Sequence, residues 1–311
     1  MISFRYHVVT IVAILFALAV GLVLGAGPLR GADDTVARAQ AGERSRSDLE
    51  AQVRAAGLRN RSSEAFARAA APTLVAGSLR NQSVTLVVLP TAEDRDVTTL
   101  TRLLRVAGAD RAGTVRVGAK LLDVADKQLV DALGTQLHEG ARGVRVPSEA
   151  GPYGQLGALL ARAIGSTRRG GEPVDRVAQS VLAGLDAAKL VSVDGRLARR
   201  GNLVLVVAGP GTGDRSVRRS TGAIVTSLVT SVDAATGGVV LAGPARAAQA
   251  DGQLRAVRSD ARASRRVSTV DSLDSGAGAA VAVLALAGQA SGSAGQYGSV
   301  GAVDGVLPAR R

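Results

Sequence analysis

The sequence predicts an α/β protein in which a parallel sheet is covered by helices on both faces, preceded by an N-terminal transmembrane helix and a helical stalk. Three observations support this. The chain begins with an uncharged apolar run, continues with an Ala-, Arg- and Glu-rich stretch, and beyond residue 80 alternates short β-branched runs with helix-period segments. We expect an anchor over residues 1–30, a stalk over 31–80 and an α/β domain over 81–311.

The apolar run at residues 8–27 has no charged residue and about the 20-residue length that crosses a bilayer as a helix. A cleaved signal peptide is the alternative. Its apolar region is usually shorter, about 7–15 residues, and Pro28 directly after Gly27 disfavours cleavage there. We therefore expect an uncleaved single-pass anchor in contact with membrane lipid.

Small residues recur at every fourth position of this run, which places them on one face of the helix. They are Ala13, Ala17, Gly21 and Gly25. Such a face lets two helix backbones approach closely, so these residues are candidates for helix packing in a homo-oligomer. The alternative is that Gly and Ala are simply common throughout this chain.

The stalk is rich in good helix formers. Three of its residues fit the a and d positions of a weak coiled coil: Leu49, Val53 and Ala56. The repeat fades at Asn60 and Ser63, and we expect the helix to end at Pro72 and Gly77.

The α/β domain should contain short strands separated by amphipathic helices. The expected strands are 84–89, 114–117, 144–146, 203–207, 239–241 and 267–270, and the expected helices include 97–107, 122–137, 174–185, 217–232 and 277–284. The near-continuous apolar runs at 203–207 and 239–241 suit strands buried on both faces. Two related halves could meet near Gly170-Gly171, and the Gly- and Ser-rich tail from Gly288 should be irregular.

The composition argues against a dedicated metal site. The chain has no cysteine, its histidines are His7 and His138, and Met1 is its single methionine. Copper(I) and zinc sites need clusters of soft or imidazole ligands, which these residues cannot form. Several carboxylates suit a solvated stalk or a helix N-terminus better than a cation site: Asp33, Asp34, Glu93, Asp94 and Asp96. We expect no metal and no cofactor.

A Gly-rich turn lies where α/β folds bind phosphate, between a strand and a helix. It reads Gly209-Pro210-Gly211-Thr212-Gly213-Asp214. It lacks the P-loop Lys-Ser/Thr, and its spacing is not that of a dinucleotide fingerprint. Asp214 fits a helix cap better than a phosphate neighbour. We interpret the turn as structural and a nucleotide site as the weaker alternative.

Neither an enzyme nor a nucleic-acid-binding protein is indicated. The sequence has no G-x-S-x-G elbow, and His138 is the one candidate base of the body. The net charge is +12, and a basic stripe at helical spacing comprises Arg255, Arg258, Arg262, Arg265 and Arg266. Without interleaved aromatic residues we interpret it as a solvated helix face, with an anionic envelope polymer or lipid as the next alternative.

The N-terminus resembles a known family. Residues 2–29, ISFRYHVVTIVAILFALAVGLVLGAGPL, closely resemble the opening of the actinobacterial copper-transport outer membrane protein family. The stalk after Gly31, the strand at 84–89 leading into Pro90, and the stretch 295–298 ahead of Leu307-Pro308 are also similar. The resemblance implies an envelope location, an outer-membrane description and a role in keeping intracellular copper low. It identifies no catalytic or copper-binding residue.

The resemblance also decides the expected orientation. More arginines follow the apolar run than precede it, which favours a cytoplasmic body, but long domains cross membranes largely regardless of charge. We therefore take an extracytoplasmic body from the resemblance. The leading hypothesis is a copper-homeostasis protein, and the alternative is an oligomeric envelope scaffold or adaptor with an indirect link to copper. A degenerate α/β enzyme or nucleotide-binding module is a third, weaker reading.

Overall fold

The computed structural model describes residues 15, 17–18, 28–141, 144 and 151–308, which fall into two compact units, Met1–Ser62 and Ser63–Arg311. In this part of the chain no helix is both long enough and apolar enough to cross a bilayer. Most of the predicted membrane helix at 8–27 lies outside the described residues, including Ala13, Gly21 and Gly25. Ala17 is helical and exposed.

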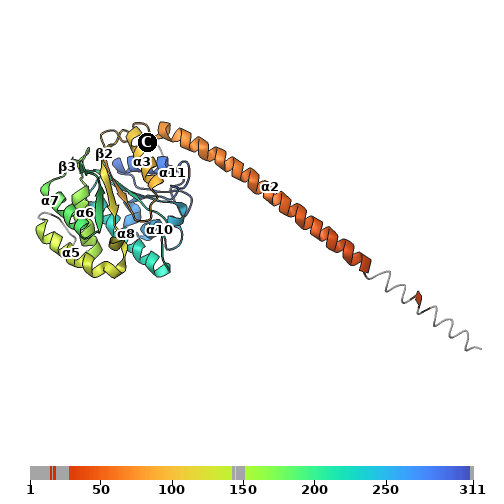
Figure 1. Cartoon of the computed structure of the whole chain (residues 1–311). Coiled ribbons are helices and arrows are strands. Elements are labelled where there is room, and N and C mark those ends of the chain that lie inside the picture. Colours follow the sequence, from red (N-terminus) through yellow and green to blue (C-terminus); the bar gives the residue numbers. More distant parts are fainter. Residues whose placement is uncertain (1–14, 16, 19–27, 142–143, 145–150, 309–311) are drawn as a thin grey trace, which may run out of the picture. The chain divides into compact units, whose positions relative to one another are not determined.

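The predicted stalk is largely one long helix, α2 (Pro28–Val75), shown in orange in Figure 1. The helix continues past Pro72 and ends before Gly77, whose φ of +70° suits a glycine that closes a helix. Pro72 was therefore wrongly predicted to end it. Leu49 and Val53 share a face, but Leu58 lies on the opposite side at 100° per residue, so the apolar seam of a coiled coil does not extend along α2.

The body is built on a seven-stranded sheet with strand order β4-β2-β1-β6-β7-β8-β9. Its strands are β1 (Ser83–Val88), β2 (Asp110–Val117), β4 (Val191–Asp194), β6 (Leu203–Val207), β7 (Val239–Ala242), β8 (Ser268–Val270) and β9 (Gln296–Tyr297). All neighbours pair in parallel except β4, which is antiparallel to β2. The predicted halves on either side of Gly170 thus share one sheet. A separate two-stranded sheet joins β3 (Glu172–Pro173) to β5 (Arg199–Arg200).

Helices cover both faces of this sheet, as the sequence predicted (Figure 1). One face packs against α5 (Lys127–Gly140), α6 (Pro152–Ile164), α7 (Arg176–Ala187), α8 (Arg215–Ala234) and α10 (Gln253–Ser259). The other packs against α3 (Asp94–Val106), α11 (Gly278–Ala290) and the end of α2. In β6, Val204 and Val206 face the first group, whereas Leu203, Leu205 and Val207 face the second, so the strand is apolar at every position.

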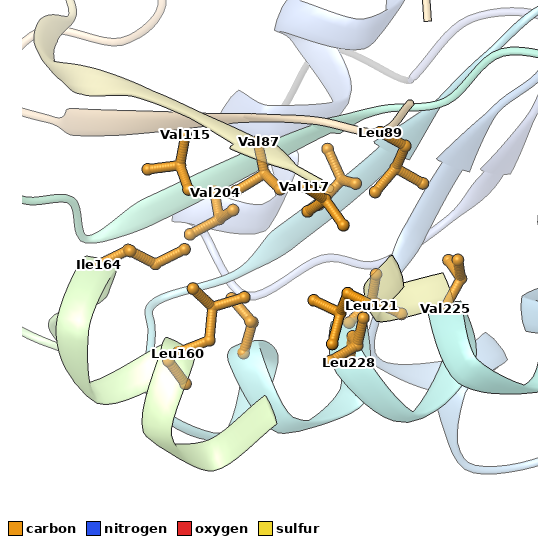
Figure 2. Packing of buried hydrophobic residues seen from close by; sticks show 14 of the residues in the cluster. Val87, Leu89, Val115, Val117, Leu121, Leu160, Ile164, Val204, Val225 and Leu228 are labelled. Carbon is orange, nitrogen blue, oxygen red and sulfur yellow. The ribbon is translucent and has the colours of Figure 1, made fainter. Parts of the chain in front are cut away.

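Small aliphatic side chains form this core. Figure 2 shows valines of the strands, including Val87 and Val204, packed over Leu160 of α6 and Leu228 of α8. Leu160 is 2% exposed and Leu228 is 5% exposed. Helices α6 and α8 also approach each other closely. At the α6–α8 contact, a Cβ on Gly157 would come within 2.9 Å of Ser231 Oγ.

Several predicted elements differ from the structure. The helix expected over 122–137 is broken after α4 (Ala119–Leu122), because Asp123 accepts a hydrogen bond from the Ala125 N–H at 2.9 Å and begins a short 3₁₀ turn, η1 (Val124–Asp126). The tail after Gly288 is not wholly irregular, since β9 extends the sheet within it. The strand expected at 144–146 lies mostly outside the described residues.

Candidate functional site

The strand order creates a crevice at one edge of the sheet. Strands β1 and β6 are parallel neighbours, yet the helices that follow them pack on opposite faces: α3 on one and α8 on the other. The two connecting loops therefore diverge at the carboxyl ends of these strands. In open α/β sheets this switch point is where ligands bind.

A cavity of about 410 Å³ lies at this switch point. Its walls come from the loop after β1, from α4 and η1 after β2, from the Gly-rich loop and first turns of α8, and from the start of α10. Four chain segments that are distant in sequence thus meet around one space. The volume lies within the range of about 300–1,000 Å³ typical of small-molecule sites.

Two glycines shape the β6–α8 loop that borders the cavity. A Cβ on Gly209 would lie 1.6 Å from the Thr91 carbonyl oxygen, so the loops after β1 and β6 can touch only without a side chain there. Gly213 has φ +78°, a conformation that L side chains rarely adopt. Asp214 caps α8 by accepting a hydrogen bond from the Val217 N–H at 2.9 Å, which confirms the predicted cap.

Donors at the start of α8 remain available to a ligand. Among the described residues, the N–H groups of Thr212, Arg215 and Ser216 have no protein acceptor. Arg218 lines the cavity and donates from Nη1 to the Gly213 carbonyl at 2.6 Å, but no carboxylate in the described part of the chain pairs with it. The amino-terminal end of α8 therefore offers free main-chain N–H groups and one guanidinium to a ligand in the cavity.

The neighbouring arginines of α8 are already engaged. Arg215 Nε lies 3.2 Å from Asp251 Oδ2, and Arg219 Nε lies 2.8 Å from Asp251 Oδ1. The hydrogen bond from Arg219 is the main reason that the pKa of Asp251 falls below its usual value. Arg218 thus differs from Arg215 and Arg219 in lacking a carboxylate partner.

Two buried polar atoms at the cavity wall also lack partners in the described chain. The Gln253 side chain is on a residue only 3% exposed, and its Oε1 accepts no hydrogen bond. Thr91 Oγ1 is likewise buried and without a partner. A buried polar group left unpaired is costly, so such atoms in a cavity wall indicate a missing ligand or water.

Asp123 adds a carboxylate to the cavity lining. Its main-chain carbonyl accepts a hydrogen bond from Tyr153 Oη at 3.3 Å. Burial, followed by the negative charges of Asp123 and Asp126, raises the pKa of the Tyr153 phenol. The cavity thus combines hydroxyl groups, an amide, one cation and one anion.

The predicted basic stripe does not form one helix face, although most of its arginines are exposed to solvent as predicted. Helix α10 ends at Ser259, and the turn that follows redirects the chain. The Arg258 side chain is 5% exposed and pairs with Asp271, while Arg266 Nε lies 2.6 Å from Asp233 Oδ2. The Arg258 side chain is therefore buried, whereas four arginines of the stripe are exposed: Arg255, Arg262, Arg265 and Arg266.

Metal-ligating residues do not gather in the described residues, where no group of three or more His, Asp or Glu side chains could hold an ion. His138 lies on α5 with a buried Nδ1 that has no partner, and His7 lies outside the described residues. Glu93 occupies the cap position of α3, and Asp94 and Asp96 lie in its first turn, as expected for a helix start. Burial is the main cause that raises the pKa of Asp96.

Comparison with known protein families identifies the family of this chain. A family model described as "Copper transport outer membrane protein, MctB" matches residues 1–308. The chain belongs to the MctB family. A comparison with curated proteins finds no match. The MctB description confirms the resemblance read from the N-terminus and supports an envelope or membrane location.

Sequence reasoning recognised only part of the cavity in this MctB-family chain. The Gly-rich turn was identified, but Thr91, Arg218 and Gln253 were not, because none belongs to a motif. The Leu-Pro and Gly-Pro steps after β1, β6 and β7 were a usable signal, since they mark strand ends at the same edge of the sheet.

Proposed function

We propose that this chain is a membrane-anchored envelope protein of copper homeostasis or efflux whose α/β body is a non-catalytic binding module without a dedicated copper site. The observation that carries the proposal is the MctB family match over residues 1–308. Copper is then a cargo whose level the protein affects, and its passage across a membrane depends on oligomers or partner proteins.

The make-up of the body supports a binding role over a catalytic one. The cavity wall offers hydroxyls, one amide, one guanidinium and one carboxylate, and His138 is not part of it. A nucleophile positioned by an adjacent base is the usual sign of covalent catalysis. Such an arrangement is not among the hydrogen bonds of the described residues around this cavity.

The apolar N-terminal run supports a single-pass anchor, and the family match supports an extracytoplasmic body. The apolar run at 8–27 has the length of one bilayer crossing. The test is protease added to intact spheroplasts, with a cytoplasmic protein as the control for lysis. Digestion of the body is expected, and full protection under conditions that degrade a known external protein would contradict the orientation.

A deletion strain tests the copper role. We expect intracellular copper to rise when the gene is removed and to return to normal when the intact gene is restored. Zinc and iron measured in the same samples are the controls. Unchanged copper in the deletion strain would contradict the proposal.

The second candidate function is an oligomeric scaffold or adaptor. It is favoured by large apolar side chains exposed on α2: Leu49 (60%), Val53 (69%), Leu58 (62%) and Phe66 (76%). We propose that a second copy of this chain covers part of this surface, together with packing along the membrane helix. Replacing Leu49 and Val53 with lysine should then lower the oligomeric state of the full chain in detergent, measured by light scattering. A rise of all metals together in the deletion strain, caused by a weakened envelope, would favour this candidate over the first.

A further inference from the structure

The switch-point cavity carries an inference about its ligand, because its lining combines two kinds of chemistry. The start of α8 and Arg218 supply hydrogen-bond donors and a positive charge, whereas Gln253, Thr91 and Asp123 supply acceptors. Each set of groups restricts the ligand independently.

The donor groups at the start of α8 suit a phosphate group. Helix α8 has 20 residues, so its amino-terminal N–H groups and its dipole favour an anion. The free N–H groups of Thr212 and Ser216 and the guanidinium of Arg218 border the same space. Arg215 and Arg219 are paired with Asp251. Among these three arginines of α8, Arg218 is therefore the one that can bind a phosphate.

The negative charge around the cavity also limits the ligand. Asp214 already occupies the cap position, and Asp123 lines the cavity. Two carboxylates near the site repel additional negative charge. A ligand with one phosphate is therefore favoured over a di- or triphosphate.

The acceptor groups of the lining require hydrogen-bond donors from the ligand. Gln253 Oε1 and Thr91 Oγ1 are buried and unpaired, and the Asp123 carboxylate can accept more than the one bond from Ala125. Hydroxyl groups of a ligand would donate to all three acceptors. Inorganic phosphate at neutral pH has at most two O–H groups, fewer than these three acceptors, so the ligand must carry hydroxyls beyond its phosphate.

We propose that this cavity binds the phosphate monoester of a polyol, such as a sugar phosphate. The phosphate contacts Arg218 and the α8 N–H groups, and the polyol hydroxyls donate to Gln253 and Thr91. This deepens the binding role proposed above, but its test is made on purified protein, so its failure is separate from a failure of the copper phenotype.

The test is calorimetric titration of the full chain in detergent with inorganic phosphate and with ribose 5-phosphate. Ribose 5-phosphate should bind more tightly than inorganic phosphate. Arg218→Gln should weaken both at least about tenfold, because a hydrogen bond to a charged group is lost. Arg219→Gln is the matched control, with the same charge change one residue away, and should stay within about twofold of wild type.

A second variant tests the acceptor groups separately from the donor groups. Gln253→Met should weaken ribose 5-phosphate about tenfold and leave inorganic phosphate within about twofold. If Gln253→Met does not fold by circular dichroism, Thr91→Val replaces it with the same expected split. Absence of ribose 5-phosphate binding to the wild type, equal effects of Arg218→Gln and Arg219→Gln, or equal affinities for the two probes would overturn the proposal.

Discussion

Arg258 and Asp271 form an ion pair in the interior of the body, with Nη1 and Oδ2 2.8 Å apart and side chains 5% and 0% exposed. Arg258 also donates to Thr269 Oγ1 and to the carbonyls of Tyr297 and Val300. Asp271 accepts from the N–H groups of Ser299 and Val300 at 2.7 and 2.9 Å. The pair therefore ties the end of β8 to the segment that contains β9.

Replacing Arg258 by leucine should destabilise the fold strongly. Asp271 would remain buried without its cation, which typically costs about 3–5 kcal/mol. Urea unfolding followed by circular dichroism measures the loss. Arg255→Leu, on the exposed side of the same helix, is the control and should change the free energy of unfolding by less than about 0.5 kcal/mol. Similar losses in both variants would contradict this role of Arg258.

Asp175 should make stability depend on pH. It caps α7 by accepting from the Ala178 N–H at 2.9 Å, and Arg162 Nη2 lies 2.5 Å from its Oδ2. The hydrogen bond from Arg162 is the main reason that the pKa of Asp175 lies below 3.8. Because the folded-state pKa is below the unfolded one, the ionised carboxylate stabilises the fold above pH 3.8, and this contribution is lost as the pH falls through the folded-state pKa.

Asp175→Asn keeps the cap but removes the charge. Solvent screens this pair, since the Asp175 side chain is 42% exposed, so the expected loss at neutral pH is at most about 1 kcal/mol. The difference from wild type should shrink as the pH is lowered below 3.8. Asp186→Asn, with the same charge change on the same helix, is the control. A difference that stays constant down to acid pH would count against the ion pair as its cause.

Gly209 should tolerate no side chain. A Cβ would meet the Thr91 carbonyl oxygen at 1.6 Å, and backbone cannot move aside as a flexible side chain can. We expect Gly209→Ala to lower the free energy of unfolding by at least about 3 kcal/mol. At Gly211 the nearest atom is Arg218 Cδ at 3.0 Å, so Gly211→Ala should cost about 1 kcal/mol or less. Equal stability of the two variants in urea unfolding would refute the close approach of these loops.

Leu160 tests the packing between the sheet and α6. It is 2% exposed beneath the strand valines in Figure 2, so Leu160→Ala should leave a cavity that costs about 2–5 kcal/mol. Leu129→Ala is the control, because Leu129 is 40% exposed on α5. A thermal melt that shows the same shift for both variants would argue against this core.

The strands were the most predictable part of the fold. The run at 203–207 is β6 residue for residue, because a strand buried on both faces must be apolar at every position. Helix α6 was missed, although Pro152 stands at its start, because Gly154 and Gly157 in its first turns have low helix propensity. Strand β4 was missed because its four residues are at the lower limit of a recognisable strand.

The candidate site was less predictable for a different reason. Its Gly-rich turn is a contiguous stretch of sequence and could be recognised. Gln253 and Thr91 are far apart in the sequence and come together only through the strand order. The basic stripe failed similarly. Arg255 and Arg258 are three residues apart on one short helix, yet only Arg258 meets the buried Asp271, which directly follows β8. Spacing alone cannot reveal that partner.

Strand β9 pairs with the edge of β8 and is held there by the clamp of Arg258 on Tyr297 and Val300. Removing the chain after residue 295 would expose the unpaired N–H and C=O groups of β8. Extended segments of other chains could then pair with this edge. By pairing with β8, strand β9 thus limits self-association of the protein. A shortened product of this protein would be recognised by its tendency to form insoluble, β-rich aggregates.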